Sequence, residues 1–154
     1  MSQTAGDVAS LYSLSSCIGC GKCDSVCPSG RNGGVYPYDI ISAILDGDPS
    51  TVTSDLQIDA WKCLMCHRCA MACPRDLDIT GAIRSLRYDS VSSGEMPKRF
   101  RTASAALAAE GRAFPVNDIV NQRRQDLGLD KIPDGGQSVN ELKIIISRTG
   151  FRNE

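Results

Sequence analysis

The chain has 154 residues, a formal charge of −1 at pH 7 and an apolar fraction of 42%, which suits a folded domain of ordinary size and argues against disorder. The balanced charge offers no basic footprint for nucleic acid. No apolar run reaches the roughly 18 residues of a membrane span, and the first residues lack the features of a secretory signal. We therefore expect a cytoplasmic protein with reduced thiols, no membrane insertion and no nucleic acid partner.

The first motif along the chain is CIGCGKCDSVCP, which ends at Pro28. It holds four cysteines, Cys17, Cys20, Cys23 and Cys27. The spacing C-x2-C-x2-C-x3-C-P is the one with which bacterial ferredoxins hold a [4Fe–4S] cluster. Three thiolates at three-residue intervals wrap a short loop around three corners of the cube. Gly19 and Gly21 let the backbone approach the cube closely, with N–H groups aimed at sulfur.

The 35 residues that separate Cys27 from the next cysteine are predicted to be helical. Pro37 is well placed to open a helix, and Gly47 is well placed to close it. One face of this helix is apolar, with Ile40, Ile41, Ile44 and Leu45. A second, short helix is expected from about Ser54 into Trp61.

A second motif, CLMCHRCAMACP, repeats the first at a constant offset of 46 positions and ends at the equivalent proline, here Pro74. Its cysteines are Cys63, Cys66, Cys69 and Cys73, and the chain has no others outside the two motifs. The second loop has bulkier side chains between its cysteines than the first. We therefore expect two cubanes that differ in reduction potential.

Two other metal sites compete for these cysteines. The letters CLMCH fit the haem attachment pattern C-x-x-C-H, but haem would leave Cys69 and Cys73 unused, and the counterpart of His67 in the first motif is Gly21. A zinc ribbon needs two C-x2-C knuckles, whereas each motif here already offers four cysteines and a proline. The repeat favours iron–sulfur clusters, with His67 as an ordinary loop residue.

Helical patterns continue after the second motif. Asp78 is a good N-cap for a helix that ends by Gly94 and Pro97, and its buried face is predicted to hold Ile79, Ala82, Ile83 and Leu86. Three more helices are expected: through Phe100, Ala103 and Leu107 as far as Gly111; from an Asn117 cap through Leu127; and after a capping box of Ser138 and Glu141. Residues 95–154 contain no cysteine, and the helices predicted there have few apolar residues. We interpret these residues as an extension that docks on a partner; a self-contained helical cap is the alternative.

Almost no alternating strand pattern is present, so the predicted fold class is all-α. We expect an α-helical ferredoxin-like domain at residues 1–94 that binds two [4Fe–4S] clusters, and a helical C-terminal extension at residues 95–154.

With these motifs the chain resembles the α-helical ferredoxin family, found in the iron–sulfur subunits of succinate dehydrogenase, glycolate oxidase and anaerobic glycerol-3-phosphate dehydrogenase. It is especially similar to the C subunits of the soluble heterodisulfide reductases of methanogenic archaea. The features that carry this likeness are Trp61-Lys62-Cys63 before the second motif, the D-I-x-x-x-I-x-x-L-R pattern from Asp78 to Arg87, and the segment ELKIIISRTGF at 141–151.

The resemblance implies that the cysteine before each proline crosses to the other cluster. One cluster would then take Cys17, Cys20, Cys23 and Cys73. The other would take Cys63, Cys66, Cys69 and Cys27.

The resemblance also implies an electron-transfer protein, part of a larger oxidoreductase, without a substrate site or catalytic residues of its own. It would relay electrons from a flavin- and iron–sulfur-containing subunit to the catalytic subunit that reduces the coenzyme M–coenzyme B heterodisulfide. A hydrogenase or a formate dehydrogenase is a further candidate partner. The alternatives are the relay subunit of another oxidoreductase, a free-standing ferredoxin and a redox sensor.

Overall fold

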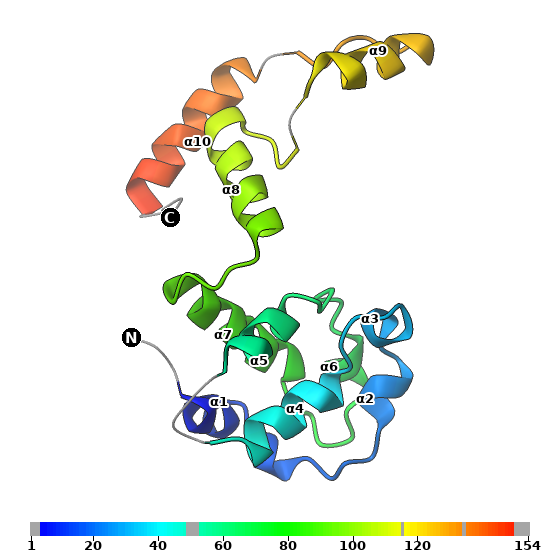
Figure 1. Ribbon diagram of the computed structural model, residues 1–154, viewed down its shortest axis with the longest axis vertical. Helices are drawn as coiled ribbons and strands as arrows, with labels where there is room; N and C mark the ends of the chain where they lie inside the picture. Colours follow the sequence, from blue (N-terminus) through cyan, green and yellow to red (C-terminus); the bar gives the residue numbers. More distant parts are fainter. Residues whose placement is uncertain (1–3, 49–52, 115, 134, 150–154) are drawn as a thin grey trace. The chain divides into compact units, whose positions relative to one another are not determined.

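The computed structural model describes residues 4–48, 53–114, 116–133 and 135–149 (Figure 1). Within these ranges the chain contains helices and loops and no strand, which confirms the all-α prediction. The chain divides into two compact units, residues 1–96 and residues 97–154. None of the helices in the described part of the chain combines the length and the apolar character that a bilayer crossing requires.

The first unit contains seven α-helices and one 3-10 turn in its described residues. They are α1 (Ala5–Leu11), the 3-10 turn (Leu14–Ser16), α2 (Lys22–Ser25), α3 (Pro28–Arg31), α4 (Pro37–Asp46), α5 (Ser54–Ala60), α6 (Arg68–Ala72) and α7 (Ile79–Ser92). Helix α7 packs against α5 and α1, and α4 packs against α1 and α5. The very short helices α2 and α6 follow the cysteine loops and pack against each other.

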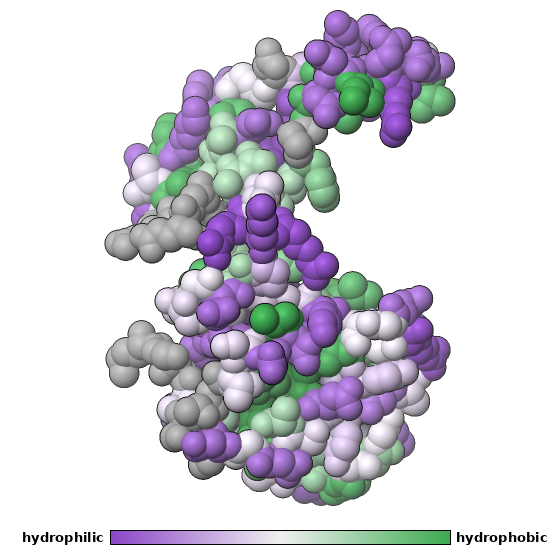
Figure 2. Space-filling view, in the orientation of Figure 1, coloured by the Kyte–Doolittle hydropathy of each residue, from purple (hydrophilic) through white to green (hydrophobic). Residues whose placement is uncertain are grey.

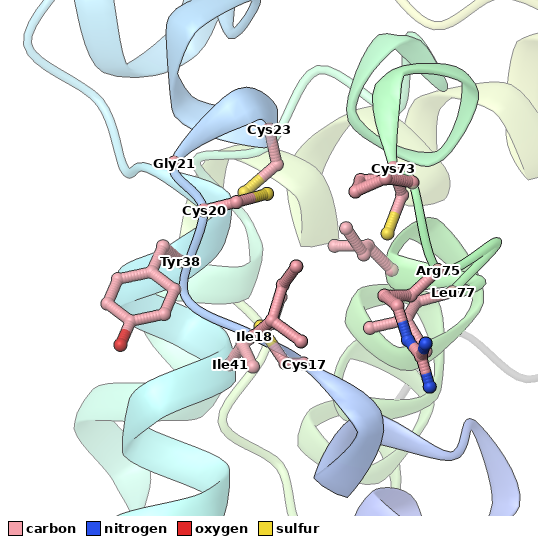
Figure 3. A pocket seen from close by; sticks show the side chains of 12 residues that line it. Cys17, Ile18, Cys20, Gly21, Cys23, Tyr38, Ile41, Cys73, Arg75 and Leu77 are labelled. Carbon is pink, nitrogen blue, oxygen red and sulfur yellow. The ribbon is translucent and has the colours of Figure 1, made fainter.

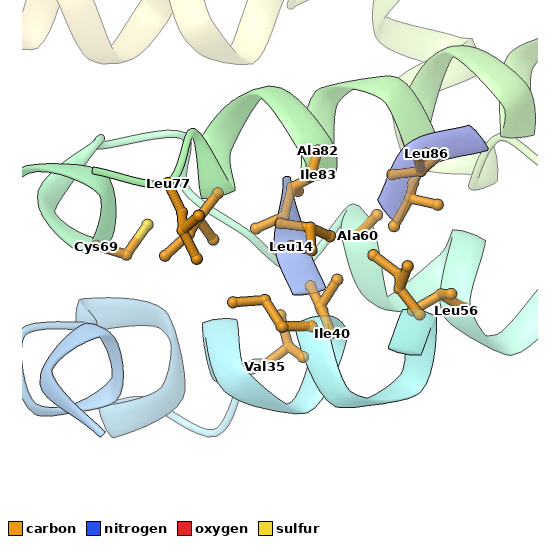
Figure 4. Close-up of a cluster of buried hydrophobic side chains, with 14 of the residues drawn as sticks. Leu14, Val35, Ile40, Leu56, Ala60, Cys69, Leu77, Ala82, Ile83 and Leu86 are labelled. Atoms are coloured by element: carbon orange, nitrogen blue, oxygen red, sulfur yellow. The ribbon is translucent and has the colours of Figure 1, made fainter. Parts of the chain in front are cut away.

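One hydrophobic core joins α1, α4, α5 and α7 (Figure 4). Its apolar members are Ala5, Val8, Leu14, Val35, Ile40, Ile41, Ile44, Leu56, Ala60, Leu77, Ile79, Ala82, Ile83 and Leu86. Cys23 and Cys69 belong to the same cluster, so the cysteine loops are attached to the core directly. Of the face predicted for α4, only Leu45 lies partly outside the core, with 39% of its surface exposed.

Side-chain caps stand at the start of several helices of this unit, including the predicted cap at Asp78. Asp78 accepts a hydrogen bond of 2.8 Å from the backbone N–H of Gly81 at the start of α7. Thr53 caps α5 in the same way. Helix α1 has a capping box, in which Thr4 and Asp7 satisfy each other's backbone N–H groups. This first helix was not predicted, although Thr4-x-x-Asp7 is close to a capping-box pattern.

The second unit consists of α8 (Lys98–Glu110), α9 (Asp118–Asp126) and α10 (Gly136–Thr149), and α8 packs against α10. None of the described residues of these helices is buried. The predicted capping box of Ser138 and Glu141 is wrong, because α10 already begins at Gly136 and Glu141 accepts a hydrogen bond from the Gln137 side chain instead. The last two residues of the ELKIIISRTGF segment lie outside the described residues.

Candidate metal centre

The two cysteine loops have the same backbone conformation, although the residues between their cysteines differ. Gly19 and Gly21 adopt left-handed φ angles of 63° and 71° in the first loop. Met65 and His67, which stand 46 positions later, adopt φ angles of 53° and 62°. Side chains rarely tolerate this region, so its recurrence at both positions indicates that the spacing of the thiols, not the residue type, dictates the turn.

The later cysteines of the two loops are also equivalent. Cys23 lies in α2 and Cys69 in α6, and their exposed fractions are 8% and 6%. Cys27 and Cys73 both have extended backbone, with φ and ψ of −79° and 114° against −74° and 120°. This extended residue turns the chain away from its own loop just before the proline.

A first cavity lies where the end of the second loop meets the first loop (Figure 3). Its four cysteines are Cys17, Cys20, Cys23 and Cys73. Cys20 and Cys23 stand on one side and Cys73 on the other. Apolar side chains from α4 and from the segment around the start of α7 complete the wall, with Ile41, Leu77 and Ile79.

A second cavity repeats this arrangement with the loops exchanged. Its four cysteines are Cys63, Cys66, Cys69 and Cys27. Pro28, Ser29 and Pro37 come from the first half of the unit, and Thr80 comes from α7. All eight cysteines therefore line one of two cavities, and each set of four contains three cysteines of one loop and the last cysteine of the other.

The donor set fits an iron–sulfur cube better than a single ion. Among the described residues, no three cysteine, histidine or carboxylate side chains are arranged so that they could hold one metal ion. Each set of four thiols instead lines one cavity. A zinc ribbon would bring its four ligands together around one atom, whereas a cube takes one thiolate at each of four separate corners.

Burial makes the thiolate form of several cysteines costly without a cation. Burial, with the negative charge of Asp24 as the next cause, raises the pKa of Cys23 to about 12. Burial also raises the pKa values of Cys63 and Cys69. Bound iron offsets this cost, because metal ligation keeps coordinating thiols deprotonated.

The second loop is tied to the rest of the unit by Arg87 of α7. Its Nε donates a 3.0 Å hydrogen bond to the carbonyl of Ala60, and its guanidinium also donates to the carbonyl of Cys63. The guanidinium carbon lies 5.1 Å from the centre of the Trp61 ring, within the range of a cation–π contact. The Trp61 Nε1 donates in turn to the hydroxyl of Ser90 at 2.6 Å. Trp61 and Arg87 thus belong to one contact network, although they stand in separate sequence motifs.

The first loop has a different anchor. The Oδ1 of Asp24 accepts a 2.9 Å hydrogen bond from the backbone N–H of Tyr38, in the first turn of α4. A carboxylate in this place also suits the positive end of the helix dipole. The two loops are therefore held by different helices, α4 for the first and α7 for the second.

Residues 13–77 match the family described as a 4Fe-4S dicluster domain. The C subunit of the ferredoxin:CoB-CoM heterodisulfide reductase of Methanosarcina mazei is 35% identical over 140 residues, which are 88% of this chain and 85% of that protein. The C subunit of the ferredoxin/F420H2-dependent CoB-CoM heterodisulfide reductase of Methanosarcina acetivorans is 38% identical over 90% of this chain and 86% of its own length. The chain belongs to the family of heterodisulfide reductase C subunits.

A further relative is the C2 subunit of the H2/formate:CoB-CoM heterodisulfide,ferredoxin reductase of Methanococcus maripaludis. It is 36% identical over 80% of this chain, and the chain spans 66% of that protein's length. As a member of this family, the protein is an iron–sulfur electron-transfer subunit of an oxidoreductase complex, and it binds two [4Fe–4S] clusters. The predicted family, fold class and cofactors are confirmed.

Three features of the centre were not predicted. The hydrogen bonds of Arg87 and the place of Thr80 in the second cavity depend on contacts between distant segments, which the sequence does not reveal. The left-handed conformation of His67 could have been inferred from its alignment with Gly21, because that glycine marks a position that demands positive φ. His67 itself is exposed, as expected for a loop residue.

Proposed function

We propose that this iron–sulfur subunit relays electrons between two other subunits of a heterodisulfide reductase complex. The upstream subunit would hold flavin and iron–sulfur centres, and the downstream subunit would reduce the coenzyme M–coenzyme B heterodisulfide. The observation that carries the proposal is the pair of cavities, each lined by four cysteines. A chain with two such clusters has the means to accept electrons and pass them on.

We assign one cluster to Cys17, Cys20, Cys23 and Cys73, and the other to Cys63, Cys66, Cys69 and Cys27. The lining of the two cavities supports this crossed assignment. Burial raises the pKa of Cys63, whereas the Met65 backbone N–H and the charge of Arg87 lower it. Cys27 adds a smaller rise to the pKa of Cys63, so Cys27 lies close enough to Cys63 to support the assignment. Crossing links the two halves of the fold, because each loop then supplies one ligand to the cluster of the other loop.

The names of the relatives support the proposed partners. Those names include ferredoxin, F420H2, H2 and formate beside CoB-CoM heterodisulfide reduction. A hydrogenase or a formate dehydrogenase is therefore a candidate upstream partner. Reduced thiols at eight cysteines suit the cytoplasm, which we propose as the location.

Residues 97–154 are proposed to dock on a neighbouring subunit. The described residues of α8, α9 and α10 include no buried side chain, so these helices share no core of their own. Hydrophobic side chains reach the surface of this unit (Figure 2), among them Phe114, Ile119, Leu127, Ile144 and Ile145. An interface with a partner would remove this apolar surface from water.

Truncation after Met96 tests both halves of the proposal. The shortened chain, co-expressed with the flavin and catalytic subunits, should retain about eight irons and eight sulfides per chain, as two cubanes require, and should no longer co-purify with them. A truncated chain that still co-purifies would refute the docking role. A full-length chain that binds neither subunit, and instead reduces soluble acceptors alone, would refute the relay and favour a free-standing ferredoxin.

A further inference from the structure

The hydroxyl of Thr80 lies in the wall of the second cavity. Thr80 is the second residue of α7 and has 0% of its surface exposed. It lines the cavity together with Cys27, Cys63, Cys66 and Cys69. Its Oγ1 forms no hydrogen bond of ordinary geometry with the described part of the chain. A buried hydroxyl without a partner destabilises a protein, so its presence at a cofactor cavity indicates that the cofactor supplies the partner.

We propose that the Thr80 hydroxyl donates a hydrogen bond to a sulfur atom of the cluster held by Cys63, Cys66, Cys69 and Cys27, and thereby raises the reduction potential of that cluster. This inference rests on the ligand sets proposed above. A hydrogen bond to sulfur favours the more negative, reduced state, because the donor dipole stabilises added negative charge.

The place of Thr80 in the cavity supports this role, because Thr80 and Cys69 line the same wall. The other hydroxyl of the cavity wall, that of Ser29, is already engaged: it donates 2.7 Å to the carbonyl of Lys62 and accepts the N–H of Val35. The Thr80 hydroxyl is therefore the one in this wall that can donate a hydrogen bond to the cluster.

The first cavity has no buried hydroxyl among its described lining residues, and the polar side chains of its wall, Arg75 and Tyr38, are both exposed. The apolar side chains of Ile41, Leu77 and Ile79 form part of its wall. The one hydroxyl among its lining residues belongs to Tyr38, whose surface is 39% exposed, so this phenol can bond to water. Thr80 thus acts on one cavity alone and biases an electron towards the second cavity.

A redox titration of the full-length protein, prepared anaerobically and followed by electron paramagnetic resonance, tests the proposal. In Thr80→Val the reduction potential of the cluster in the second cavity should fall by about 59 mV. The distribution of an electron between the two clusters should then shift roughly tenfold towards the cluster in the first cavity. The potential of the cluster in the first cavity should stay within error of the wild type. The cluster that shifts should be the one whose signal changes in Cys66→Ser.

Three controls separate the loss of the Thr80 hydroxyl from other effects of the substitution. Thr80→Ser keeps the hydroxyl and should keep the wild-type potential, whereas Thr80→Ala should behave like Thr80→Val. Ile79→Val changes the adjacent residue, which lines the first cavity, without removing a polar group and should leave the second cluster's potential unchanged. In the reduced wild type, an exchangeable proton coupled to the second cluster should disappear in Thr80→Val when hydrogen and deuterium spectra are compared.

The proposal is overturned if Thr80→Val retains both potentials, if both shift together, or if Thr80→Ser behaves like Thr80→Val. Iron and sulfide analysis separates this failure from a failure of the ligand assignment. A variant that keeps the wild-type content while its potentials do not move refutes the role of Thr80 alone. A shift confined to the cluster that Cys20→Ser alters refutes the assignment of the cavity.

Discussion

The two cysteine loops adopt the same backbone conformation although the residues between their cysteines differ. Both place left-handed residues after their first and second cysteines, both bury their third cysteine, and both extend at the fourth. They differ in what surrounds them. The first loop is tied to α4 through Asp24, and the second is tied to α7 through Arg87. The spacing of the cysteines therefore sets the shape of the site, whereas contacts with distant helices set the stability and the properties of each half.

Removing the anchor of the second loop should have the largest effect on this difference. Arg87→Gln loses the hydrogen bonds to the carbonyls of Ala60 and Cys63 and the contact with Trp61. We expect the loop to open more easily by about 2 kcal/mol, which would speed the loss of the second cluster to a chelator roughly 30-fold. Release can be followed by absorbance under anaerobic conditions. Arg84→Gln, an exposed neighbour on α7, is the matched control and should release iron at the wild-type rate.

Removing the anchor of the first loop should have a smaller effect, on the other cluster. Asp24→Ala leaves the backbone N–H of Tyr38 without its acceptor, at a cost of about 1 kcal/mol. Loss of the first cluster should then be roughly fivefold faster in the same chelator assay. Asp39→Ala removes an exposed carboxylate from the first turn of α4 and serves as the control. Equal acceleration of both clusters by Asp24→Ala would show that the loops are not anchored separately.

The smallest effects should come from exchanging residues at the shared left-handed position. Gly21→Ala should lower the free energy of unfolding by about 1 kcal/mol, because a side chain strains this backbone. His67→Gly relieves the same strain but adds disorder to the unfolded chain, so the change should be within about 0.5 kcal/mol of zero. The midpoint of urea unfolding of the cluster-loaded protein measures both. Two equally destabilising substitutions would mean that the loops do not share this conformation in solution.

The features that the sequence could predict are those with a local cause. The cysteine spacing, the Asp78 cap and the 3.6-residue apolar patterns of α4 and α7 each act within a few residues, and the structure contains all of them. The capping box at Ser138 was misplaced because a serine–glutamate pair three residues apart also occurs inside a helix, and here α10 begins earlier. Arg87 and Thr80 could not be assigned, since their roles arise only when α7 packs beside the second loop.

In the second unit, too, the sequence predicts the helices but not the surface against which they pack. Its helices have the expected caps at Asn117 and Gly111, yet their described residues bury nothing. Local signals were sufficient to predict that these helices exist. They give no account of which surface their apolar side chains cover, because that surface belongs to another chain in the arrangement we propose.

The crossed ligand sets are the centre of this account, and the paired variants Cys27→Ser and Cys73→Ser test them most directly. Electron paramagnetic resonance of the reduced, full-length proteins can be compared with Cys20→Ser and Cys66→Ser, each of which alters the cluster of its own loop. We predict that Cys27→Ser alters the signal that Cys66→Ser alters, and that Cys73→Ser alters the signal that Cys20→Ser alters. The reverse pairing would show that each loop supplies all four ligands of its own cluster and would contradict the account.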